Sequence, residues 1–218
     1  MSPATNHQEQ LLRDVVRLLR HPVQSSGVVP CADGWCCIAN VVDAINSAPG
    51  RHWLPTSIKL LREAVLDEPN ERFELNGTKV RALYGHSWSH VLMGRIANPP
   101  SVLYHGSRLS HLARILATGL HPRTRTKLHL SSNLCYAAKV AATHPDPVVL
   151  SINGLALAPQ ITLRQANSHV WLSDKIGPEF LRLDPERCSV FRCRYHAANR
   201  RVDDDEDSTE TEHRDRCG

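Results

Sequence analysis

The stretch RFELNGTKVRALY, residues 72–84, decides the fold of the N-terminal half of the chain. Its two ends are typical of short β-strands, and the dipeptide Asn76-Gly77 between them is the strongest short-range signal for a hairpin turn. Toward the N-terminus, apolar residues recur with helical spacing in three windows. These windows are residues 11–19, 38–45 and 58–66. Three helices followed by a hairpin predict a winged-helix module, a fold that does not by itself assign a function.

The predicted helix ends place two candidate site residues. Pro22 cannot continue a helix, so the first helix ends just before it, and the side chains of Arg20 and His21 lie at its C-terminal end. Thr56 is the predicted N-cap of the third helix, because a hydroxyl at that position can accept a hydrogen bond from a free backbone N–H.

The second half of the chain has a different pattern, which begins after the helix breakers Asn98-Pro99-Pro100-Ser101. Helical windows at residues 109–116, closed by Gly119, and 134–143 are interspersed with short strand patterns. The predicted strands are residues 102–104, 128–130, 148–152, 161–163, 170–172 and 190–192. Because the order lacks βαβ regularity and no glycine-rich phosphate loop is present, a Rossmann or P-loop site has little support.

The sequence therefore predicts an α+β protein in three parts. Residues 1–97 form the winged-helix lobe, and residues 98–202 form a second lobe of antiparallel strands with helices. Residues 203–218 form an acidic tail that we expect to be disordered, because it is highly charged and has almost no apolar residues.

The composition is that of a soluble globular protein, with 41% hydrophobic and 22% charged residues among 218. No apolar run approaches the roughly 18 residues that a membrane-spanning helix needs, so we expect no membrane partner. The N-terminus has neither the basic start nor the apolar core of a secretory signal. This predicts an intracellular protein and leaves the cytoplasm and the nucleus open.

Seven cysteines are present, an odd number. They form no C-x-x-C pair, and no histidines are spaced to complete a zinc site. We therefore expect unpaired thiols in a reducing compartment and no bound metal.

The net charge of +4 hides an asymmetry along the chain. Residues 203–218 hold eight acidic residues against two arginines, a net −6, which leaves +10 for the first 202 residues. Only five of the basic residues are lysines, so the positive charge is mostly guanidinium, the group suited to forked contacts with phosphate. This favours an anionic partner, although solvated surface arginines would give the same composition.

Four stretches concentrate Arg, His, Ser and Gly, the residue types that bind and transfer phosphate. They are Leu19–Pro22, Glu71–Phe73 with Arg81–Ser87, Leu103–Ser107 and Arg123–Ser131. Each also has an ordinary structural interpretation. Cations are favoured at the C-terminal end of any helix, Arg72 could lie on a solvated strand face, and His86 or His129 could be a structural imidazole.

The order of these stretches carries more information than any one of them. The series reads Leu19-Arg20-His21, Asp33-Gly34-Trp35, Arg72-Phe73, Val80–Ser87, Leu103–Ser107, Gly119–Pro122, Arg125, His129-Leu130-Ser131, Val170–Ser173 and Pro178–Leu181. In residue types and order it resembles the RNA 2′-phosphotransferase family, the tRNA 2′-phosphotransferases, along most of the chain.

The resemblance implies an enzyme with an RNA-binding winged-helix lobe and an ADP-ribosyltransferase-like lobe that holds NAD⁺ as co-substrate, without a metal. The implied partner is RNA that bears an internal 2′-phosphate, typically tRNA after splicing, and we expect a monomer. In the family's first step the RNA phosphate attacks the anomeric ribose carbon of NAD⁺ and expels nicotinamide. In the second step the 2″-hydroxyl attacks the phosphorus, which releases ADP-ribose 1″,2″-cyclic phosphate and RNA with a free 2′-hydroxyl.

The resemblance also implies roles for individual residues. The family's catalytic set falls on Arg20, His21, Arg72 and Arg125. The three arginines would hold the phosphate, while His21 would either hold it or move a proton. The residues implied for NAD⁺ are His105, Gly106, Ser107 and Ser131, and those implied for RNA or phosphate are Arg81, His86 and Ser87.

The sequence departs from the family pattern at a few positions. Lys127 stands where many relatives have His, Arg123 replaces a usual Met, and Tyr84 replaces a usual Gln. Ser168-His169 stands where Asn-Gly is common. All four catalytic positions are retained, so we expect activity, with cofactor affinity or substrate preference open to change.

Two other functions stay open on the residues alone. An ADP-ribosyltransferase that stops after the first step would cap terminal phosphates of RNA or DNA, although His21 and Arg125 favour the complete reaction. A non-catalytic winged-helix RNA-binding protein would need only the basic charge. That alternative leaves Arg125 and the second lobe unexplained.

Overall fold

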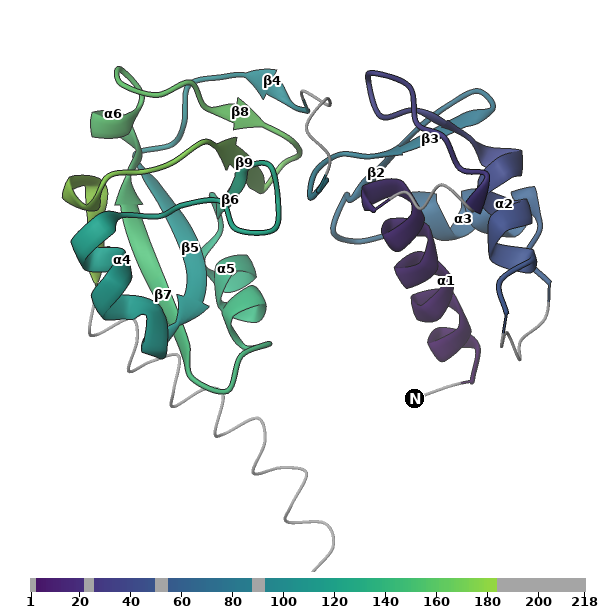
Figure 1. The fold of residues 1–218 in the computed structure, drawn as a ribbon, viewed down its shortest axis with the longest axis horizontal. Coiled ribbons are helices and arrows are strands. Elements are labelled where there is room, and N and C mark those ends of the chain that lie inside the picture. Colours follow the sequence, from purple (N-terminus) through teal and green to yellow (C-terminus); the bar gives the residue numbers. More distant parts are fainter. Residues whose placement is uncertain (1–2, 22–25, 50–54, 88–92, 184–218) are drawn as a thin grey trace, which may run out of the picture.

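The computed structural model describes residues 3–21, 26–49, 55–87 and 93–183. They form two antiparallel sheets, each with its own helices (Figure 1), which confirms the α+β prediction. The predicted strand at residues 190–192, the acidic tail and the cysteines Cys188, Cys193 and Cys217 lie outside the described residues. Within the described part, no helix has the length and apolarity to cross a membrane.

Three helices and a three-stranded sheet make up the N-terminal half. They are α1 (Pro3–Arg20), α2 (Ile38–Asn46), α3 (Ile58–Leu66), β1 (Cys36–Cys37), β2 (Phe73–Asn76) and β3 (Lys79–Ala82). β3 lies between β1 and β2 and pairs antiparallel with both. Apolar side chains from all six elements meet in one buried cluster, in which Val15, Leu61 and Val80 have no exposed surface.

The three predicted helices and the hairpin are confirmed. Asn76 pairs with Lys79, so the tight loop of the hairpin is Gly77-Thr78. Gly77 has φ +57, a conformation that glycine adopts without a steric penalty.

The predicted cap of the third helix is wrong by one residue. Ser57 caps α3, because its hydroxyl accepts a hydrogen bond from the Leu60 backbone N–H at 3.2 Å. The backbone N–H of Thr56 donates instead to Oδ1 of Asn46 at 2.9 Å, which ties the start of α3 to the end of α2.

A seven-stranded sheet forms the C-terminal half. Its strands are β4 (Arg95–Ile96), β5 (Val102–Arg108), β6 (Leu128–Ser131), β7 (Pro147–Asn153), β8 (Arg164–Gln165), β9 (Val170–Ser173) and β10 (Leu181–Leu183). They are arranged in the order β10-β7-β5-β6-β9-β8-β4, and every pair is antiparallel.

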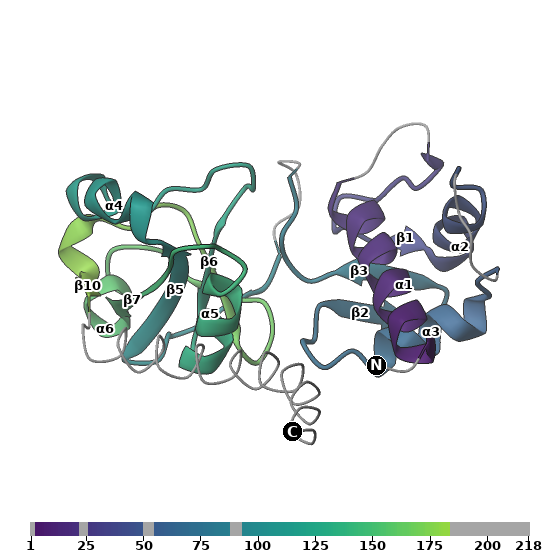
Figure 2. The same ribbon diagram turned by 90° about the horizontal axis from the view of Figure 1, so that it is seen from below.

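The helices of this half are α4 (Leu112–Thr118), α5 (Leu134–Ala141) and α6 (Gly154–Leu157), with 3-10 turns η2 (Leu109–His111) and η3 (Pro178–Phe180). In both views α5 lies on the side of the sheet nearest α1 (Figures 1 and 2). β5 runs directly under α5, because a Cβ on Gly106 would lie 2.5 Å from the Ala137 carbonyl oxygen. Glycine at this position therefore allows the helix to pack closely on the strand.

Most of the predicted elements of this half are confirmed, with two differences. The window at residues 109–116 begins as a 3-10 turn and then continues as α4, which ends at Gly119 with φ +84 as predicted. The strand predicted at residues 161–163 is wrong, because the chain pairs only at the next two residues, Arg164-Gln165. Leu163 is buried in the core from irregular backbone.

The larger sheet takes its first strand from the N-terminal side of the predicted boundary at Asn98. β4 pairs with β8 through Arg95↔Gln165 and Ile96↔Arg164. Met93, just before β4, packs with Val170 of β9 in a small apolar cluster that also contains Tyr84 from the first half. The two halves thus meet along β8, β9 and the segment after β3.

Candidate phosphate-binding site

A cavity of about 500 Å³ lies where the two halves meet. The first half contributes Arg20, at the end of α1, and Arg72, just before β2. The second half contributes Arg125, in the loop before β6, and Tyr136 on α5. Three guanidinium groups from distant segments of the sequence therefore line one cavity, as the catalytic prediction requires, together with Arg123 and Lys127 from the same loop as Arg125.

Arg20 is buried, and no carboxylate of the described residues pairs with its charge. Its side chain stacks on Tyr84, with Cζ 4.7 Å from the ring centre. Among the described residues, its Nε and Nη2 atoms have no hydrogen-bond partner. Burial lowers the pKa of Arg20 to about 10, a shift that Tyr84 opposes and that Arg125 and Arg72 increase. A buried cation with open donors is suited to binding an anion.

Gly85 makes room for the Arg20 guanidinium. A Cβ at residue 85 would lie 2.9 Å from both Cζ and Nε of Arg20, closer than a real side chain approaches. Gly85 also has φ +91, where side chains are strained. Both the backbone conformation and the adjacent side chain therefore require glycine.

We expect Gly85→Ala to lower the free energy of unfolding by roughly 2–4 kcal/mol, because backbone strain and displacement of Arg20 add together. Gly77→Ala is the matched control, since Gly77 also has positive φ but nothing lies within 4 Å of its Cβ position. It should cost only about 1 kcal/mol. Urea denaturation measures both losses, and equal losses would contradict the packing role.

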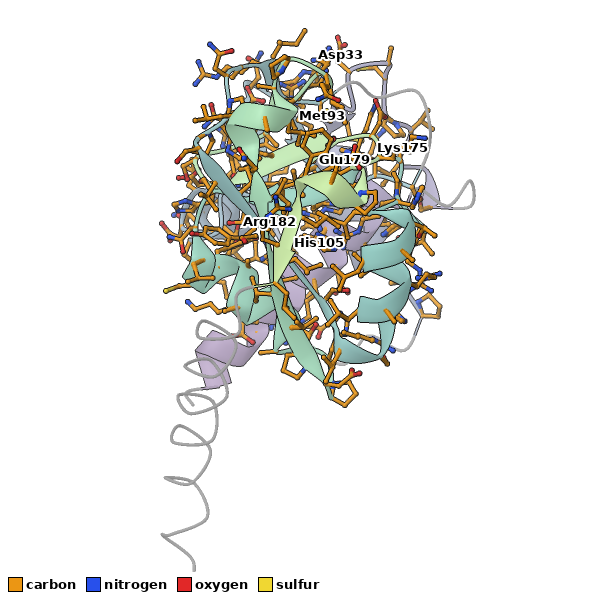
Figure 3. All side chains as sticks on the ribbon, turned by 90° about the vertical axis from the view of Figure 1, so that its left-hand side faces the viewer. Asp33, Met93, His105, Lys175, Glu179 and Arg182 are labelled. Carbon is orange, nitrogen blue, oxygen red and sulfur yellow. The ribbon has the colours of Figure 1, made fainter. Side chains whose placement is uncertain are left out.

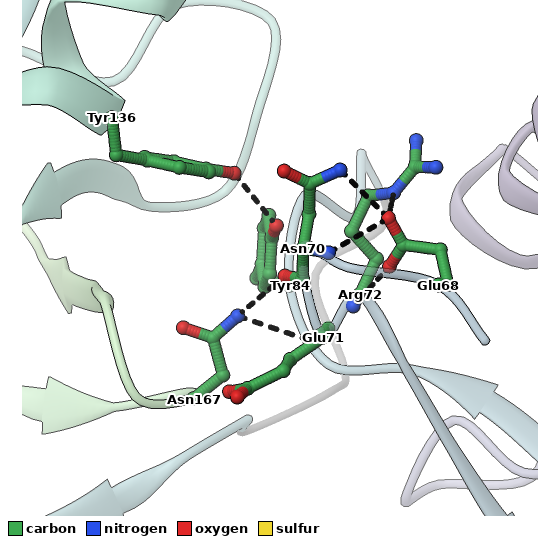
Figure 4. Close-up of polar contacts among 7 residues, drawn as sticks. All are labelled: Glu68, Asn70, Glu71, Arg72, Tyr84, Tyr136 and Asn167. Atoms are coloured by element: carbon green, nitrogen blue, oxygen red, sulfur yellow. Dashed lines mark hydrogen bonds and ion pairs between the residues drawn. The ribbon is translucent and has the colours of Figure 1, made fainter. Parts of the chain in front are cut away.

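Glu68 holds the second cation, Arg72. Arg72 Nε lies 3.0 Å from Oε1 of Glu68, and its backbone N–H donates to Oε2 at 2.8 Å. The backbone N–H and side-chain amide of Asn70 also donate to Glu68 Oε1. Burial raises the pKa of Glu68, but these hydrogen bonds and the Arg72 charge outweigh it and leave the pKa below its usual value. The terminal nitrogens of Arg72 point away from Glu68 (Figure 4).

His129 positions the third cation, Arg125. Arg125 Nη1 lies 3.3 Å from Nδ1 of His129. Since a guanidinium only donates, this contact needs an unprotonated Nδ1. The His129 ring packs against Tyr84 at 5.7 Å between centroids, so one tyrosine contacts both Arg20 and the imidazole that holds Arg125.

His21 lies beside this group of cations on the exposed end of α1. Its Nδ1 is 2.9 Å from the hydroxyl oxygen of Ser87, and the Ser87 backbone N–H donates to the Arg20 carbonyl at 3.2 Å. Burial lowers the pKa of His21, and the charges of Arg125 and Arg20 lower it further. His21 and Ser87 thus form a pair next to the cavity, although neither is among the residues that line it.

Three imidazoles near the cations, the buried His86 and the half-buried His105 and His129, have lowered pKa values, which favours their neutral form. Burial lowers the pKa of His86 to about 4, with further contributions from Arg20, His21 and Arg81. Burial also lowers the pKa of His129 well below its usual value, as it does for His105, whose Nδ1 donates to the His129 carbonyl at 2.9 Å. The guanidinium groups therefore carry most of the positive charge in the cavity.

These shifts predict a loss of stability in acid. The folded protein keeps His86 neutral down to about pH 4, whereas the unfolded chain binds a proton near pH 6.5. Titration of His86 therefore has no effect on stability above about pH 6.5, and as the pH drops toward 4 it lowers the free energy of unfolding by roughly 2 kcal/mol. Urea denaturation of the wild type and of His86→Gln at pH 7 and pH 4.5 measures the difference. If the free energy of unfolding had the same pH dependence in both proteins, this role of His86 would be contradicted.

The residues implied for NAD⁺ divide into two groups. His105, Gly106 and Ser131 line the cavity. His105 lies on β5, near the middle of this half of the molecule (Figure 3). Ser131 is buried, and its hydroxyl donates to the Asn133 carbonyl at 2.9 Å. Ser107 is also buried but does not line the cavity.

Arg81 lies elsewhere, although the sequence groups it with the RNA- or phosphate-binding residues. Its Nε donates to Glu74 at 2.8 Å, and its guanidinium stacks over Trp35 at 4.4 Å. It lines a different cavity, of about 590 Å³, together with Arg95 and Gln165. Arg81 is the cross-strand partner of Glu74 in the hairpin, whereas Arg72 precedes β2 and is bound by Glu68.

Several residues of the site were not singled out from the sequence. Tyr84 was noted only as a departure, yet it contacts Arg20 and His129, and its hydroxyl lies 3.1 Å from that of Tyr136. Its position beside Gly85 in a predicted site motif was the available signal. Glu68 had none, because a carboxylate four residues before an arginine is common on solvated segments. Within the ranges that the structure describes, no group of three or more His, Cys, Asp or Glu side chains could hold a metal ion.

Comparison with known proteins places this chain in a family. Residues 6–175 match the family described as RNA 2′-phosphotransferase, Tpt1 / KptA family. The chain is 33% identical over 165 residues to a probable RNA 2′-phosphotransferase of Streptomyces coelicolor, an alignment that covers 75% of this chain and 88% of the relative. The similarity to a protein of the same description from Hahella chejuensis is 35% over 170 residues, with coverages of 76% and 89%. The match spans both halves of the structure and the segments that carry Arg20, Arg72 and Arg125, and the chain therefore belongs to the RNA 2′-phosphotransferase, Tpt1 / KptA family.

Proposed function

We propose that this protein transfers an internal 2′-phosphate of RNA, such as a spliced tRNA, to NAD⁺. The products are RNA with a free 2′-hydroxyl, nicotinamide and ADP-ribose 1″,2″-cyclic phosphate. The observation that carries the proposal is the convergence of Arg20, Arg72 and Arg125 on one cavity, with open donors on Arg20 and with His21 beside it. Family membership supports the same reaction class.

The cavity fits a dinucleotide in size and chemistry. Its volume is typical of cofactor sites, and it combines apolar walls from Leu128 and Val140 with polar groups from His105 and Ser131. These residues of β5, β6 and α5 would hold the nucleotide. When bound, NAD⁺ supplies the electrophilic anomeric carbon and nicotinamide as the leaving group.

The protein groups then have separate tasks. The guanidiniums of Arg20, Arg72 and Arg125 bind the 2′-phosphate and hold one of its oxygens against the anomeric carbon. During transfer of the phosphoryl group the same three cations stabilise the charge on its oxygens. His21 is exposed enough to bind the phosphate or to move a proton to or from the reacting hydroxyls, and its lowered pKa keeps an uncharged fraction at pH 7.

The proposal extends to the two halves of the molecule. Residues 1–97 act as a winged-helix RNA-binding lobe, which three helices and a β-hairpin support. Residues 98–202 act as an ADP-ribosyltransferase-like lobe that holds NAD⁺, which the antiparallel sheet beside the cavity supports. β4 extends from the first range into the sheet of the second.

Incubation with an oligoribonucleotide that bears one internal 2′-phosphate, with and without NAD⁺, tests this function. We expect loss of the 2′-phosphate only with NAD⁺, together with nicotinamide and the cyclic phosphate product. Phosphate loss without NAD⁺ would indicate a phosphatase. Stable ADP-ribosylated nucleic acid without the cyclic product would indicate a transferase that stops after the first step. Absence of any reaction would indicate a non-catalytic RNA-binding protein.

A further inference from the structure

The segment that carries Arg72 is held from the other half of the molecule. In the turn between β8 and β9, the side-chain amide of Asn167 donates to the carbonyl oxygens of Asn70 and Glu71, both at 3.0 Å (Figure 4). From the same turn, the Ser168 backbone N–H donates to the Glu71 carboxylate at 3.0 Å. Three hydrogen bonds thus connect the larger sheet to the two residues that precede Arg72.

Asn167 uses both ends of its amide for different purposes. Its Oδ1 accepts from the backbone N–H groups of His169, at 2.9 Å, and Val170, at 2.6 Å, which fixes its own turn. Its Nδ2 donates across to Asn70 and Glu71, its only partners in the part of the chain that the structure describes. The turn therefore presents a fixed donor to the first half of the molecule.

The segment that Asn167 holds is strained. Glu71 has φ +48, and it is the only non-glycine residue with positive φ in the described ranges. Such a conformation persists only where neighbouring contacts impose it. The next residue is Arg72, whose backbone N–H and guanidinium are both bound by Glu68. A change in the Glu71 backbone would therefore alter the direction in which Arg72 enters the cavity.

We propose that Asn167 is a positioning residue for the transfer reaction, which holds the strained Glu71 backbone and thereby sets the position of Arg72. The inference rests on the proposed function for its kinetic part. Asn167 does not line the cavity that contains the three arginines, so it acts through the chain that it holds. It also makes the geometry of Arg72 depend on the larger sheet, which carries the residues implied for NAD⁺.

Two variants separate this role from others. Asn167→Asp keeps an oxygen acceptor for His169 and Val170 but removes the donor to Asn70 and Glu71. Asn167→Ala removes both functions without adding charge. A loss of kcat that both variants share is therefore caused by removal of the Asn167 Nδ2 donor. Asn153→Asp is the matched control, because Asn153 also uses Oδ1 to accept a backbone N–H, from Ala156 at 3.1 Å, in the α6 cap.

We expect both Asn167 variants to lower kcat by about 10- to 100-fold with little change in KM for RNA, because a displaced catalytic group loses transition-state contacts. Asn153→Asp should stay within twofold of the wild type. In an Arg72→Ala background, Asn167→Asp should lower kcat less than threefold further, since Arg72 is what Asn167 positions. Equal effects in both backgrounds would overturn the proposal.

Hydrogen exchange of the backbone amides of residues 68–72 tests the same inference without activity. The Asn70 and Arg72 amides, which donate to Glu68, should exchange at least about tenfold faster in Asn167→Asp than in the wild type or Asn153→Asp. Unchanged exchange would overturn the proposal even if kcat fell. A wild-type protein that does not react with 2′-phosphorylated RNA would overturn the proposed function, while exchange would still decide whether Asn167 holds this segment.

Discussion

Arg72→Ala should lower kcat on RNA with an internal 2′-phosphate by about 10²- to 10³-fold, while KM for the RNA changes less than about tenfold. Arg72 lines the cavity, and its terminal nitrogens point away from Glu68 (Figure 4), so their charge is available when charge develops on the transferred phosphoryl group. Steady-state kinetics at constant ionic strength measure the two parameters. A protein that merely binds RNA would show only a salt-sensitive loss of affinity.

Glu68 supplies the control for this variant. Its side chain is almost fully buried, so removal of the Arg72 guanidinium leaves a carboxylate held by hydrogen bonds alone. Arg72→Ala should therefore also be measured in a Glu68→Gln background, which removes the buried charge. We expect the same loss of kcat in both backgrounds and a smaller loss of stability in the second. If Glu68→Gln restored kcat, the effect of Arg72→Ala would be one of folding.

Arg20→Met should abolish detectable turnover and yet leave the fold as stable as the wild type or more stable, by roughly 1–3 kcal/mol. The pKa of Arg20 is lowered to about 10, so the fold disfavours its charge. Because Arg20 is a base with a lower pKa in the folded than in the unfolded state, keeping it charged lowers the free energy of unfolding at every pH below about 10. Methionine carries no charge and removes this cost. Loss of the stacking on Tyr84 offsets part of this gain.

Arg17→Met is the matched control, because it makes the same change on an exposed residue in the last turn of α1. It should leave turnover and stability close to those of the wild type. Thermal denaturation and the assay with 2′-phosphorylated RNA measure the pair. A large destabilisation by Arg20→Met would show that the buried cation supports the fold, contrary to the expectation that it serves the reaction.

The sequence predicted elements that have a strong repeating pattern. The helices of the first half and the hairpin follow from apolar spacing and turn chemistry and were predicted correctly, although the loop is Gly77-Thr78, one residue after the predicted Asn76-Gly77. The strand at residues 161–163 was wrong because Leu163 is a core residue on irregular backbone, whereas the paired residues, Arg164-Gln165, are polar and too few to show a period. The Ser57 cap was missed because two adjacent hydroxyl residues offer the same chemistry.

For the site, order along the chain indicated which residues to compare, but it could not show their surroundings. Arg20, Arg72 and Arg125 line one cavity, whereas Arg81 is bound to Glu74, and only the strand pairing reveals that difference. The contacts of Tyr84, Glu68 and Asn167 join segments from different elements or halves. Such contacts leave no periodic pattern in a sequence, so the structure was needed to find them.

The open donors of the buried Arg20 guanidinium have a practical consequence for anyone who handles this protein. A preformed cationic pocket does not distinguish the phosphate of a nucleic acid from free phosphate or sulfate in a buffer, since both offer oxygens of the same geometry and charge. These ions should therefore compete with the RNA. Assays in phosphate buffer, or after ammonium sulfate precipitation without dialysis, would then underestimate how tightly the substrate is held.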